Sequence, residues 1–284
     1  MAKKKINNLS KIPPKIFAEN FWAIWFLVAV FLILVFTAKQ DSLARFAWQN
    51  RWLKMAILLD RSDVDLAMFI GNYYFNGVFG GGEYNPDVAL KAYEKAVRVN
   101  PKILWGHYQL ARIYFVKGNY DKALSEINLE FEANPENLRS LYVRGLIYGY
   151  RAVSGDLGKA EEDFQRFTKW APREWAGYND FAWVLSKQGK YSEAEKTISL
   201  AFKEALDAKN NPWLWNALGV AQLNLKKYSN ATDSFKKAKE LAEKLTINDW
   251  ARAYPGNNPS TGGEGLSAFL KAISENLRRA ESKK

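Results

Sequence analysis

Two stretches of the chain carry residue types that could do chemistry, and neither of them completes a known kind of site. DRSDVD at 60–65 spaces its carboxylates like the start of a calcium loop, but the glycine and the terminal glutamate of such a loop are missing. Ser62 or Asp63 fits better as the N-cap of a helix. The glycines at 80–82 are not followed by the Gly-Lys-Ser/Thr of a phosphate loop, so a flexible turn is expected there.

Histidine and cysteine chemistry is equally limited. His107 is the only histidine, and it falls on a predicted helix at a position that favours a core or interface role. The chain has no cysteine, which excludes disulfides, thiolate nucleophiles and Cys-ligated zinc. The sequence offers no nucleophile with a base, no carboxylate pair and no metal-ligand set. We therefore expect no catalytic residue, no metal site, no cofactor and no enzymatic activity.

An apolar segment near the N-terminus predicts a membrane anchor. Residues 21–38 read FWAIWFLVAVFLILVFTA without a charge, and the apolar character reaches back to Ile16. A helix over 16–38 is long enough to cross a hydrocarbon core of roughly 30 Å at about 1.5 Å per residue. A cleaved signal peptide is the alternative, but Phe36 would then stand three residues before the cut after Ala38, where small residues are preferred. We favour an uncleaved, single-pass transmembrane helix in contact with membrane lipid.

The distribution of charge predicts the orientation of this anchor and argues against nucleic-acid binding. The formal net charge is +11, but outside the N-terminus acidic and basic residues are interleaved, so no nucleic-acid partner is expected. Five lysines precede the predicted span and four basic residues follow it closely. Because basic residues are favoured on the cytoplasmic side, we expect residues 1–15 to form a basic cytoplasmic tail and the rest of the chain to lie outside the cytoplasm.

Residues 39–61 follow the span and show helical spacing of apolar residues, with Trp48 and Trp52 four apart. This juxtamembrane amphipathic helix could lie on the bilayer, where tryptophan and basic residues are favoured. It could instead be the first helix of the following domain, with its apolar stripe packed on the next helix. We favour the second interpretation.

A short phrase recurs through the rest of the chain. It reads GNYDKAL at 118–124, GKYSEAE at 189–195 and KKYSNAT at 226–232. Its alanine has equivalents spaced by 34, 37, 34 and 37 residues, at Ala89, Ala123, Ala160, Ala194 and Ala231. A larger residue follows each alanine by four positions: Tyr93, Ile127, Phe164, Ile198 and Phe235. This spacing puts a small and a large residue on one helix face, where a neighbouring helix can approach closely. Proline at 101, 135 and 172 is expected in the first turn of helices.

WLWNALGVAQL at 213–223 contains the W-x₂-L-G pattern, and with it the sequence resembles the tetratricopeptide repeat family. The resemblance implies an all-α fold: a right-handed α-solenoid of about five helix pairs over 62–245, in which Gly118 and Asn119 form a turn between paired helices. Residues 246–284 would form an irregular connector and a C-terminal capping helix, with Leu266, Phe269, Leu270, Ile273 and Leu277 on one face.

The resemblance also implies a function, since the first helices of the pairs line a concave groove that binds peptides or partner proteins. The equivalent groove positions here are Trp105, Tyr108, Arg112, Phe115, Arg139, Tyr142, Leu146, Asn179, Trp183, Trp213 and Asn216. These rings could alternatively fill gaps inside the solenoid. The expected function is a membrane-anchored scaffold for protein–protein interaction. The alternatives are an accessory subunit of a cell-envelope assembly or export complex, and an import-receptor-like protein with cytosolic repeats.

Overall fold

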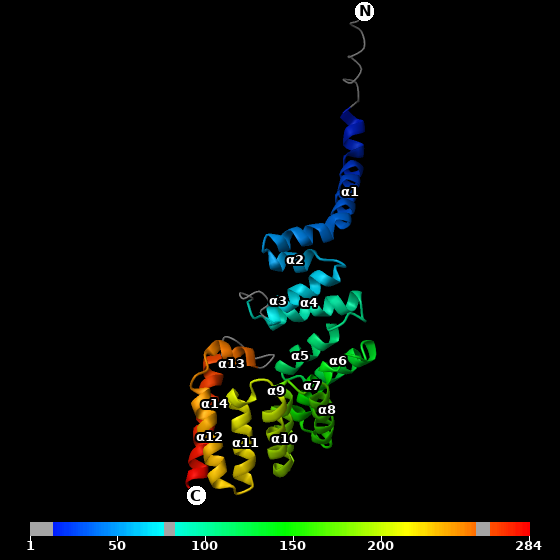
Figure 1. Ribbon diagram of the computed structural model, residues 1–284. Helices are drawn as coiled ribbons and strands as arrows, with labels where there is room; N and C mark the ends of the chain where they lie inside the picture. The colour runs from blue at the N-terminus through cyan, green and yellow to red at the C-terminus, as the bar shows by residue number, and fades with distance from the viewer. Residues whose placement is uncertain (1–13, 77–82, 254–261) are drawn as a thin grey trace, which may run out of the picture. The chain divides into compact units, whose positions relative to one another are not determined.

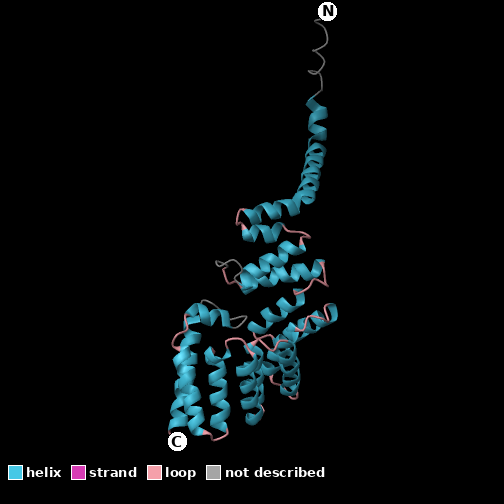
Figure 2. Cartoon of the chain, in the orientation of Figure 1, coloured by secondary structure: helices cyan, strands magenta, loops and turns pink. Residues whose placement is uncertain are grey.

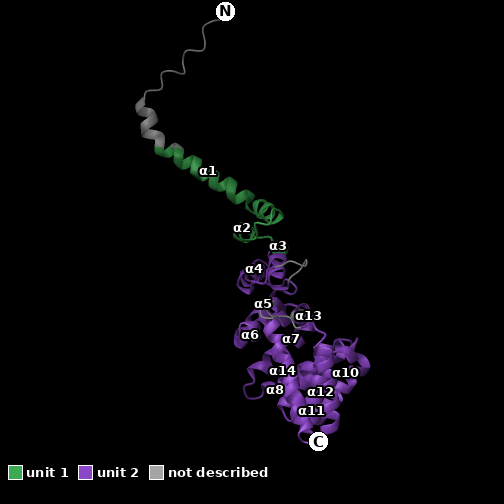
Figure 3. Cartoon of the chain, turned by 90° about the vertical axis from the view of Figure 1, so that its left-hand side faces the viewer, with its two compact units in different colours: residues 1–66 green, residues 67–284 purple. Residues whose placement is uncertain are grey.

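The computed structural model describes residues 14–76, 83–253 and 262–284. Within those ranges the chain forms fourteen α-helices and one short 3₁₀ helix without a β-strand (Figure 2), so the all-α prediction is confirmed. The expected basic tail, apart from its last two residues, lies outside the described residues, as do the glycines at 80–82 and most of the predicted connector. The chain divides into two compact units, Met1–Leu66 and Ala67–Lys284 (Figure 3).

The helices follow one another as antiparallel pairs along the chain (Figure 1). The first unit holds α1 (Pro14–Gln49) and α2 (Leu53–Leu59), and α3 (Val64–Asn76) begins at its end. The predicted five pairs are α3 with α4 (Pro86–Val99), α5 (Gly106–Val116) with α6 (Tyr120–Ala133), α7 (Arg139–Arg151) with α8 (Asp156–Trp170), α9 (Trp175–Lys187) with α10 (Tyr191–Glu204), and α11 (Pro212–Asn224) with α12 (Tyr228–Ala242). Two helices follow, α13 (Ile247–Ala253) and α14 (Gly262–Glu281).

Small residues on the first helix of each pair receive a large residue from the second helix. A Cβ added at Gly71, Gly145 or Gly219 would lie 2.4–3.0 Å from the ring of Tyr93, Phe164 or Phe235, respectively. The second and fourth pairs carry alanine in place of the glycine and isoleucine in place of the ring, as Ala111 with Ile127 and Ala182 with Ile198. Glycine therefore accompanies an aromatic ring and alanine accompanies an isoleucine, as close packing between two helices requires when the larger side chain changes in size.

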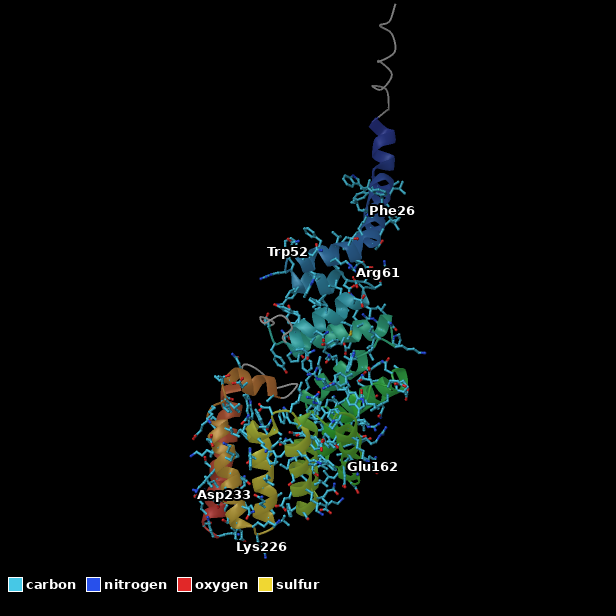
Figure 4. All side chains as sticks on the ribbon, viewed as in Figure 1. Phe26, Trp52, Arg61, Glu162, Lys226 and Asp233 are labelled. Atoms are coloured by element: carbon cyan, nitrogen blue, oxygen red, sulfur yellow. The ribbon has the colours of Figure 1, made fainter. Side chains whose placement is uncertain are left out.

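The recurring phrase forms the turn within a pair, as predicted. Gly118 has a φ of +72°, and its N–H donates to the Phe115 carbonyl at 2.9 Å while the Asn119 N–H donates to the Tyr114 carbonyl at 2.9 Å. Gly189 and Lys226 occupy the same left-handed position in the fourth and fifth pairs, with φ of +75° and +60°. Figure 4 shows Lys226 at the loop between α11 and α12. The two hydrogen bonds donated by Gly118 and Asn119 form the Schellman motif, which ends a helix at a residue in the left-handed conformation.

The same motif closes α1, where the structure departs from the predicted boundary between a span and a separate juxtamembrane helix. α1 continues without interruption to Gln49, because no glycine or proline stands between residues 21 and 49. Arg51, with a φ of +60°, then makes the turn: its N–H donates to the Trp48 carbonyl and the Trp52 N–H to the Ala47 carbonyl. Residues 39–61 thus contain the end of α1, a turn and α2.

The α1–α2 hairpin resembles a shortened copy of the repeated helix pair. This copy was not identified from the sequence. Ala56 stands five residues after the left-handed Arg51, as Ala231 does after Lys226, and 33 residues before Ala89. Ala44 stands twelve residues before Ala56, the same interval as between Gly219 and Ala231. Ala44, Ala47 and Ala56 are all buried between the two helices. The end of α1 therefore packs against α2 within the first unit, as the first helix of a repeated pair packs against the second. That this segment begins the repeat domain stays a prediction.

The C-terminal helix closes the solenoid as predicted. α14 packs against α12, and its Ile273 is fully buried in a cluster with Phe235 and Ala238, with Phe269, Leu270 and Leu277 packed on the same cluster. The prolines at 101, 135 and 172 lie in the loops before helices, three to five residues ahead of the next helix start, so their expected first-turn positions were wrong. Pro86 and Pro212 take the first helical position instead, behind the capping side chains of Asn85 and Asn211.

Candidate functional site: an aromatic groove on the first helices of the pairs

A groove of about 580 Å³ lies in the second unit, on the face formed by the first helices of pairs two to five. α5, α7, α9 and α11 contribute most of its lining, and α13 and α14 contribute one residue each. Its lining is dominated by aromatic side chains: Phe115, Tyr120, Tyr150, Trp183, Trp213, Trp250 and Phe269. A volume of this size falls within the range of about 300–1,000 Å³ typical of ligand sites.

The aromatic side chains form two groups. In the first, the Phe115 ring meets the Tyr150 ring edge-on at 5.2 Å, and Tyr150 packs against Trp183 at 4.8 Å, so the rings step from α5 through α7 to α9. In the second, Trp213 stacks on Phe269 at 5.7 Å and Trp250 lies 5.5 Å from Phe269. Trp213 also stacks on Trp175 of α9 at 5.3 Å, which ties this second group to the preceding repeat.

Trp183 is held in the groove by a glycine on the neighbouring helix. A Cβ on Gly149 of α7 would lie 2.6 Å from the Trp183 ring, so only glycine leaves room for the indole there. The carbonyl of Gly149 accepts a hydrogen bond of 2.9 Å from Lys187 Nζ, and the same ammonium lies 4.5 Å from the centre of the Trp183 ring. The backbone of α7 and a cation from α9 together fix this indole.

Among the polar lining residues, Asp180 of α9 stands out. Its side chain is buried, with 6% of the residue exposed, and the Tyr142 hydroxyl donates to its Oδ2 at 2.7 Å. The Asn179 amide donates to its Oδ1 at 3.0 Å. Burial raises the pKa of Asp180 to about 6, although both hydrogen bonds act in the opposite direction. Burial and the nearby Asp180 carboxylate raise the pKa of the Tyr150 hydroxyl.

The structure brings six of the predicted groove residues to this groove. They are Phe115, Leu146, Asn179, Trp183, Trp213 and Asn216. The Oδ1 atom of Asn216 is buried and accepts no hydrogen bond from any residue that the structure describes. Four of these six residues lie on α9 and α11, which contact each other directly.

The other predicted groove residues have intramolecular contacts and do not line this groove. Trp105 precedes α5 in a left-handed conformation, with a φ of +71°, and its ring meets Tyr108 edge-on at 5.0 Å. The buried Glu130 carboxylate accepts the backbone N–H groups of both residues, each at 3.1 Å, and so caps the first turn of α5. Tyr142 is buried and engaged with Asp180.

The two predicted arginines are also occupied. Arg112 is buried, donates to Asn76 Oδ1 at 2.8 Å and to Gln109 Oε1 at 2.6 Å, and lies over the Phe75 ring at 4.8 Å. Arg139 forms an ion pair of 2.9 Å with Glu174. These five predicted residues therefore connect neighbouring helices, while the six above line one continuous groove.

Sequence reasoning missed Asp180, Tyr150, Trp250 and Phe269 as lining residues. Asp180 is adjacent to the predicted Asn179, so a comparison of polar residues within the fourth repeat could have suggested it. Trp250 and Phe269 come from outside the repeats, on α13 and α14. No repeat register could place them, because their position depends on how the C-terminal segment packs back on the solenoid.

The other residues considered for chemistry have structural roles. Asp63 Oδ1 accepts the Leu66 N–H at 3.1 Å and caps α3, as expected, and Asp63 Oδ2 pairs with Arg45 at 2.6 Å. His107 is buried and its Nδ1 lies 2.7 Å from Glu126 Oε2, which joins α5 to α6. The hydrogen bond to Glu126 is the main cause that raises the pKa of His107, against the opposing effect of burial.

Comparison with known sequences identifies the repeats independently. Models described as tetratricopeptide repeat match residues 92–125 and 214–245. The chain is 27% identical over 139 residues to the BBSome complex member BBS4 of Bos taurus. That match covers 48% of this chain but only 25% of BBS4, so the chain spans about a quarter of the length of this relative.

Comparison with solved structures supports the same fold. A tetratricopeptide repeat protein from Parabacteroides merdae superposes with a TM-score of 0.52 at 19% identity, over 84% of each chain. PilW, described as a widely conserved type IV pilus biogenesis factor, superposes with a TM-score of 0.56 at 17% identity, over 77% of this chain and 98% of PilW. At these identities the likeness establishes the arrangement of helix pairs and nothing about partners.

Proposed function

Because this chain is a tetratricopeptide-repeat protein, we propose that it is a membrane-anchored scaffold that binds a protein or peptide partner in the aromatic groove of its repeat domain. The repeats indicate a protein–protein interaction scaffold in general terms. The finer proposal assigns the binding site to the groove residues Phe115, Asn179, Trp183, Trp213 and Asn216, and the anchor to α1.

The observation that carries the binding site is the groove itself. Folded domains normally bury aromatic rings, whereas here rings from seven residues surround a space of about 580 Å³ on one face. Tryptophan and tyrosine are also the side chains that most often dominate binding energy at interfaces. Arg139, Arg112 and Tyr142, in contrast, are satisfied within the chain and are less suited to contact a partner.

The membrane anchor is supported by the length and composition of α1. Its 36 residues exceed the roughly 20 residues that a hydrocarbon core requires, and they correspond to about 54 Å of helix. An 18-residue window within residues 25–49 is apolar enough to span a membrane, a test that a signal sequence also passes. Trp22, Phe26 and Phe31 are each more than 60% exposed, as expected for a helix that faces lipid. Figure 4 shows Phe26 on this helix.

The proposed topology places the N-terminus in the cytoplasm and the repeats outside it, because five lysines precede the span. A cysteine introduced at Ser10 and another at Ser282 would test this in intact cells with a membrane-impermeant maleimide. Labelling of the Ser282→Cys variant alone supports the proposed topology. Labelling of Ser10→Cys alone would reverse it and favour the import-receptor alternative, and an intact mass that lacks residues 1–38 would show a cleaved signal peptide instead.

The test of the binding site is a comparison of partner capture by groove variants in native membranes. The native protein, a Trp183→Ala/Asn216→Ala variant and a Trp170→Ala control would be crosslinked in cells and purified with their partners. Trp170 is a partly exposed tryptophan on α8 that does not line the groove, so it controls for the loss of an indole. We expect the groove variant alone to lose a specific partner while its circular dichroism stays helical.

Retention of the same partner by the groove variant would contradict this assignment. The contact would then lie on α1, the α1–α2 hairpin or the outer face of the repeats. Crosslinks from α1 to another membrane protein would favour the alternative of an accessory subunit in a cell-envelope complex. The structural neighbour PilW is described as a type IV pilus biogenesis factor.

A further inference from the structure

Asp180 presents a problem of charge compensation. The carboxylate is buried in the middle of α9, and its two hydrogen-bond donors, Tyr142 and Asn179, are both neutral. No basic side chain in the described ranges forms an ion pair with it or contributes to its titration. Buried carboxylates are costly unless a cation or several donors compensate them, so a half-compensated one requires an explanation.

The nearest cation on the same helix does not provide this compensation. Lys187 stands two turns after Asp180, where its ammonium donates to the Gly149 carbonyl at 2.9 Å and lies over the Trp183 ring. The whole chain carries a net charge of +11, yet Asp180 is the one charged residue among the described residues that line the groove. In an otherwise basic protein, the electrostatic character of this groove is therefore negative.

A second polar group in the same groove, the side-chain amide of Asn216, has a hydrogen-bond acceptor that is unsatisfied within the described ranges. Asn216 Oδ1 on α11 is buried and has no hydrogen-bond donor among the described residues, although buried acceptors are rarely left unpaired. α9 and α11 contact each other, and Asp180 and Asn216 both line the groove, as do the aromatic residues Tyr150, Trp183 and Trp213. The combination consists of a carboxylate, an amide oxygen and flat aromatic surfaces.

This combination matches a guanidinium group better than other common ligand groups. A guanidinium is planar, stacks on aromatic faces, presents several N–H donors in a fixed fork and is weakly hydrated, so it can be buried beside a carboxylate. A carboxylate ligand would be repelled by Asp180. An ammonium group would satisfy the charge but would not use the flat aromatic surfaces to the same extent.

We propose that the groove receives an arginine side chain of the partner protein, with its guanidinium on Asp180 and Asn216 Oδ1 and its plane against the aromatic rings. This inference rests on the proposed function of the groove and names the chemistry of the segment that binds there. In the complex the arginine supplies the cation that Asp180 lacks and a donor for Asn216. The hydrogen bond from Tyr142 holds the carboxylate in place before the partner arrives.

The experiment uses the full-length protein in detergent micelles and two pools of fluorescein-labelled peptides. Each pool has the form X₅-Arg-X₅ or X₅-citrulline-X₅, with X drawn from uncharged residues. Citrulline has the shape of arginine without its charge. Fluorescence anisotropy gives the apparent affinity of each pool for the native protein, for Asp180→Asn and for Asp233→Asn. Asp233 is an exposed aspartate on α12 (Figure 4) and serves as a control for the loss of one negative charge.

We expect the native protein and Asp233→Asn to bind the arginine pool about tenfold or more tightly than the citrulline pool. Asp180→Asn should bind both pools equally. The preference of the native protein for the arginine pool over the citrulline pool should also decline as the pH falls below about 6, where Asp180 becomes protonated in the free protein. Of the tyrosines near Asp180, Tyr142 donates its hydroxyl to the carboxylate, and Tyr150 lines the groove, where burial raises the pKa of its hydroxyl and keeps it neutral in this range.

Three results would overturn the proposal, and they differ in what they leave standing. Equal affinity of the native protein for both pools, with binding lost in Trp183→Ala, would retain the groove as a peptide site and remove arginine as its ligand. A preference for arginine that survives in Asp180→Asn would have the same effect. If neither pool binds at millimolar concentration, the result would count against the peptide groove as well as the arginine site.

Discussion

The Tyr142 hydroxyl donates a hydrogen bond of 2.7 Å to the Asp180 carboxylate and thereby joins α7 to α9 across two successive repeats. Both side chains are buried, and burial raises the pKa of Asp180 to about 6 from its ordinary value of 3.8. The hydrogen bond therefore connects the packing of the solenoid to a carboxylate in the candidate binding groove.

The first prediction concerns the pH dependence of stability. Between pH 4 and 6 the folded protein retains a proton on Asp180 that the unfolded chain releases, so this group makes the protein less stable as the pH rises through that range. Asp180→Asn removes the cost of burying the charge, and we expect the free energy of unfolding at pH 7.5 to increase by about 2–3 kcal/mol. Urea titrations followed by circular dichroism at pH 4.5 and 7.5 would measure this effect.

The matched variant Tyr142→Phe keeps the ring and removes the donor. We expect it to lose about 1–3 kcal/mol at pH 7.5, because the charged carboxylate loses one of its two donors. The loss should be smaller at pH 4.5, where the carboxyl is protonated. A gain in stability from Asp180→Asn of the same size at both pH values would show that its carboxyl titrates normally.

The second prediction tests the complementarity of glycine and aromatic rings within a pair. In Gly219→Ala the new Cβ would lie 2.6 Å from the Phe235 ring, and we expect a loss of about 1–3 kcal/mol despite the higher helix propensity of alanine. The double variant Gly219→Ala/Phe235→Ile reproduces the combination found in the second and fourth pairs. A double-mutant cycle should give a favourable coupling of about 1 kcal/mol or more.

The control for this cycle is Gly158→Ala on α8. A Cβ at Gly158 would have no neighbour within 4 Å, so alanine there should stabilise the helix by about 0.5–1 kcal/mol. If the two substitutions at 219 and 235 change the free energy of unfolding additively, the helices adjust their separation without a cost. The Phe235 ring would then not restrict which residue occupies position 219.

The third prediction uses the left-handed turn residues. Lys226 takes the position that Gly118 and Gly189 occupy in other pairs, with a φ of +60°, and a side chain there costs about 1 kcal/mol. Lys226→Gly should therefore raise the free energy of unfolding by about 1 kcal/mol. Lys227→Gly, at the next residue with a φ of −84°, should lower it slightly. Equal effects of the two substitutions would show that the backbone conformation at 226 is not the cause.

The fourth prediction concerns His107. Its hydrogen bond to Glu126 raises the pKa above the ordinary value of 6.5, so the stabilisation is complete below pH 6.5 and is lost as the pH rises through the folded pKa. Glu126→Gln should cost about 1 kcal/mol at pH 6 and less at pH 9. A cost that does not change with pH would show that His107 is neutral throughout and that the contact is an ordinary neutral hydrogen bond.

The sequence by itself determined the class of fold and the unit from which it is built. Ala89, Ala123, Ala160, Ala194 and Ala231 recur at nearly constant intervals, and all are completely buried in the structure. A small residue at a fixed position is required wherever two helices approach closely, so the repeat could be recognised without coordinates. The long apolar segment was legible for a similar reason, because its composition alone distinguishes it from the repeats.

The tertiary structure decided which residues share a surface. The repeat register assigned Trp105, Tyr108 and Trp183 to the groove, but only Trp183 lines it, because neighbouring helices fill the space around the other two. Trp250 and Phe269 join the groove from outside the repeats through contacts between residues distant in the chain. Asp180 acquires its raised pKa from burial, which outweighs the opposing hydrogen bond from Tyr142, 38 residues earlier. A local pattern carries the geometry of one helix pair, whereas the environment of a side chain depends on all the helices packed around it.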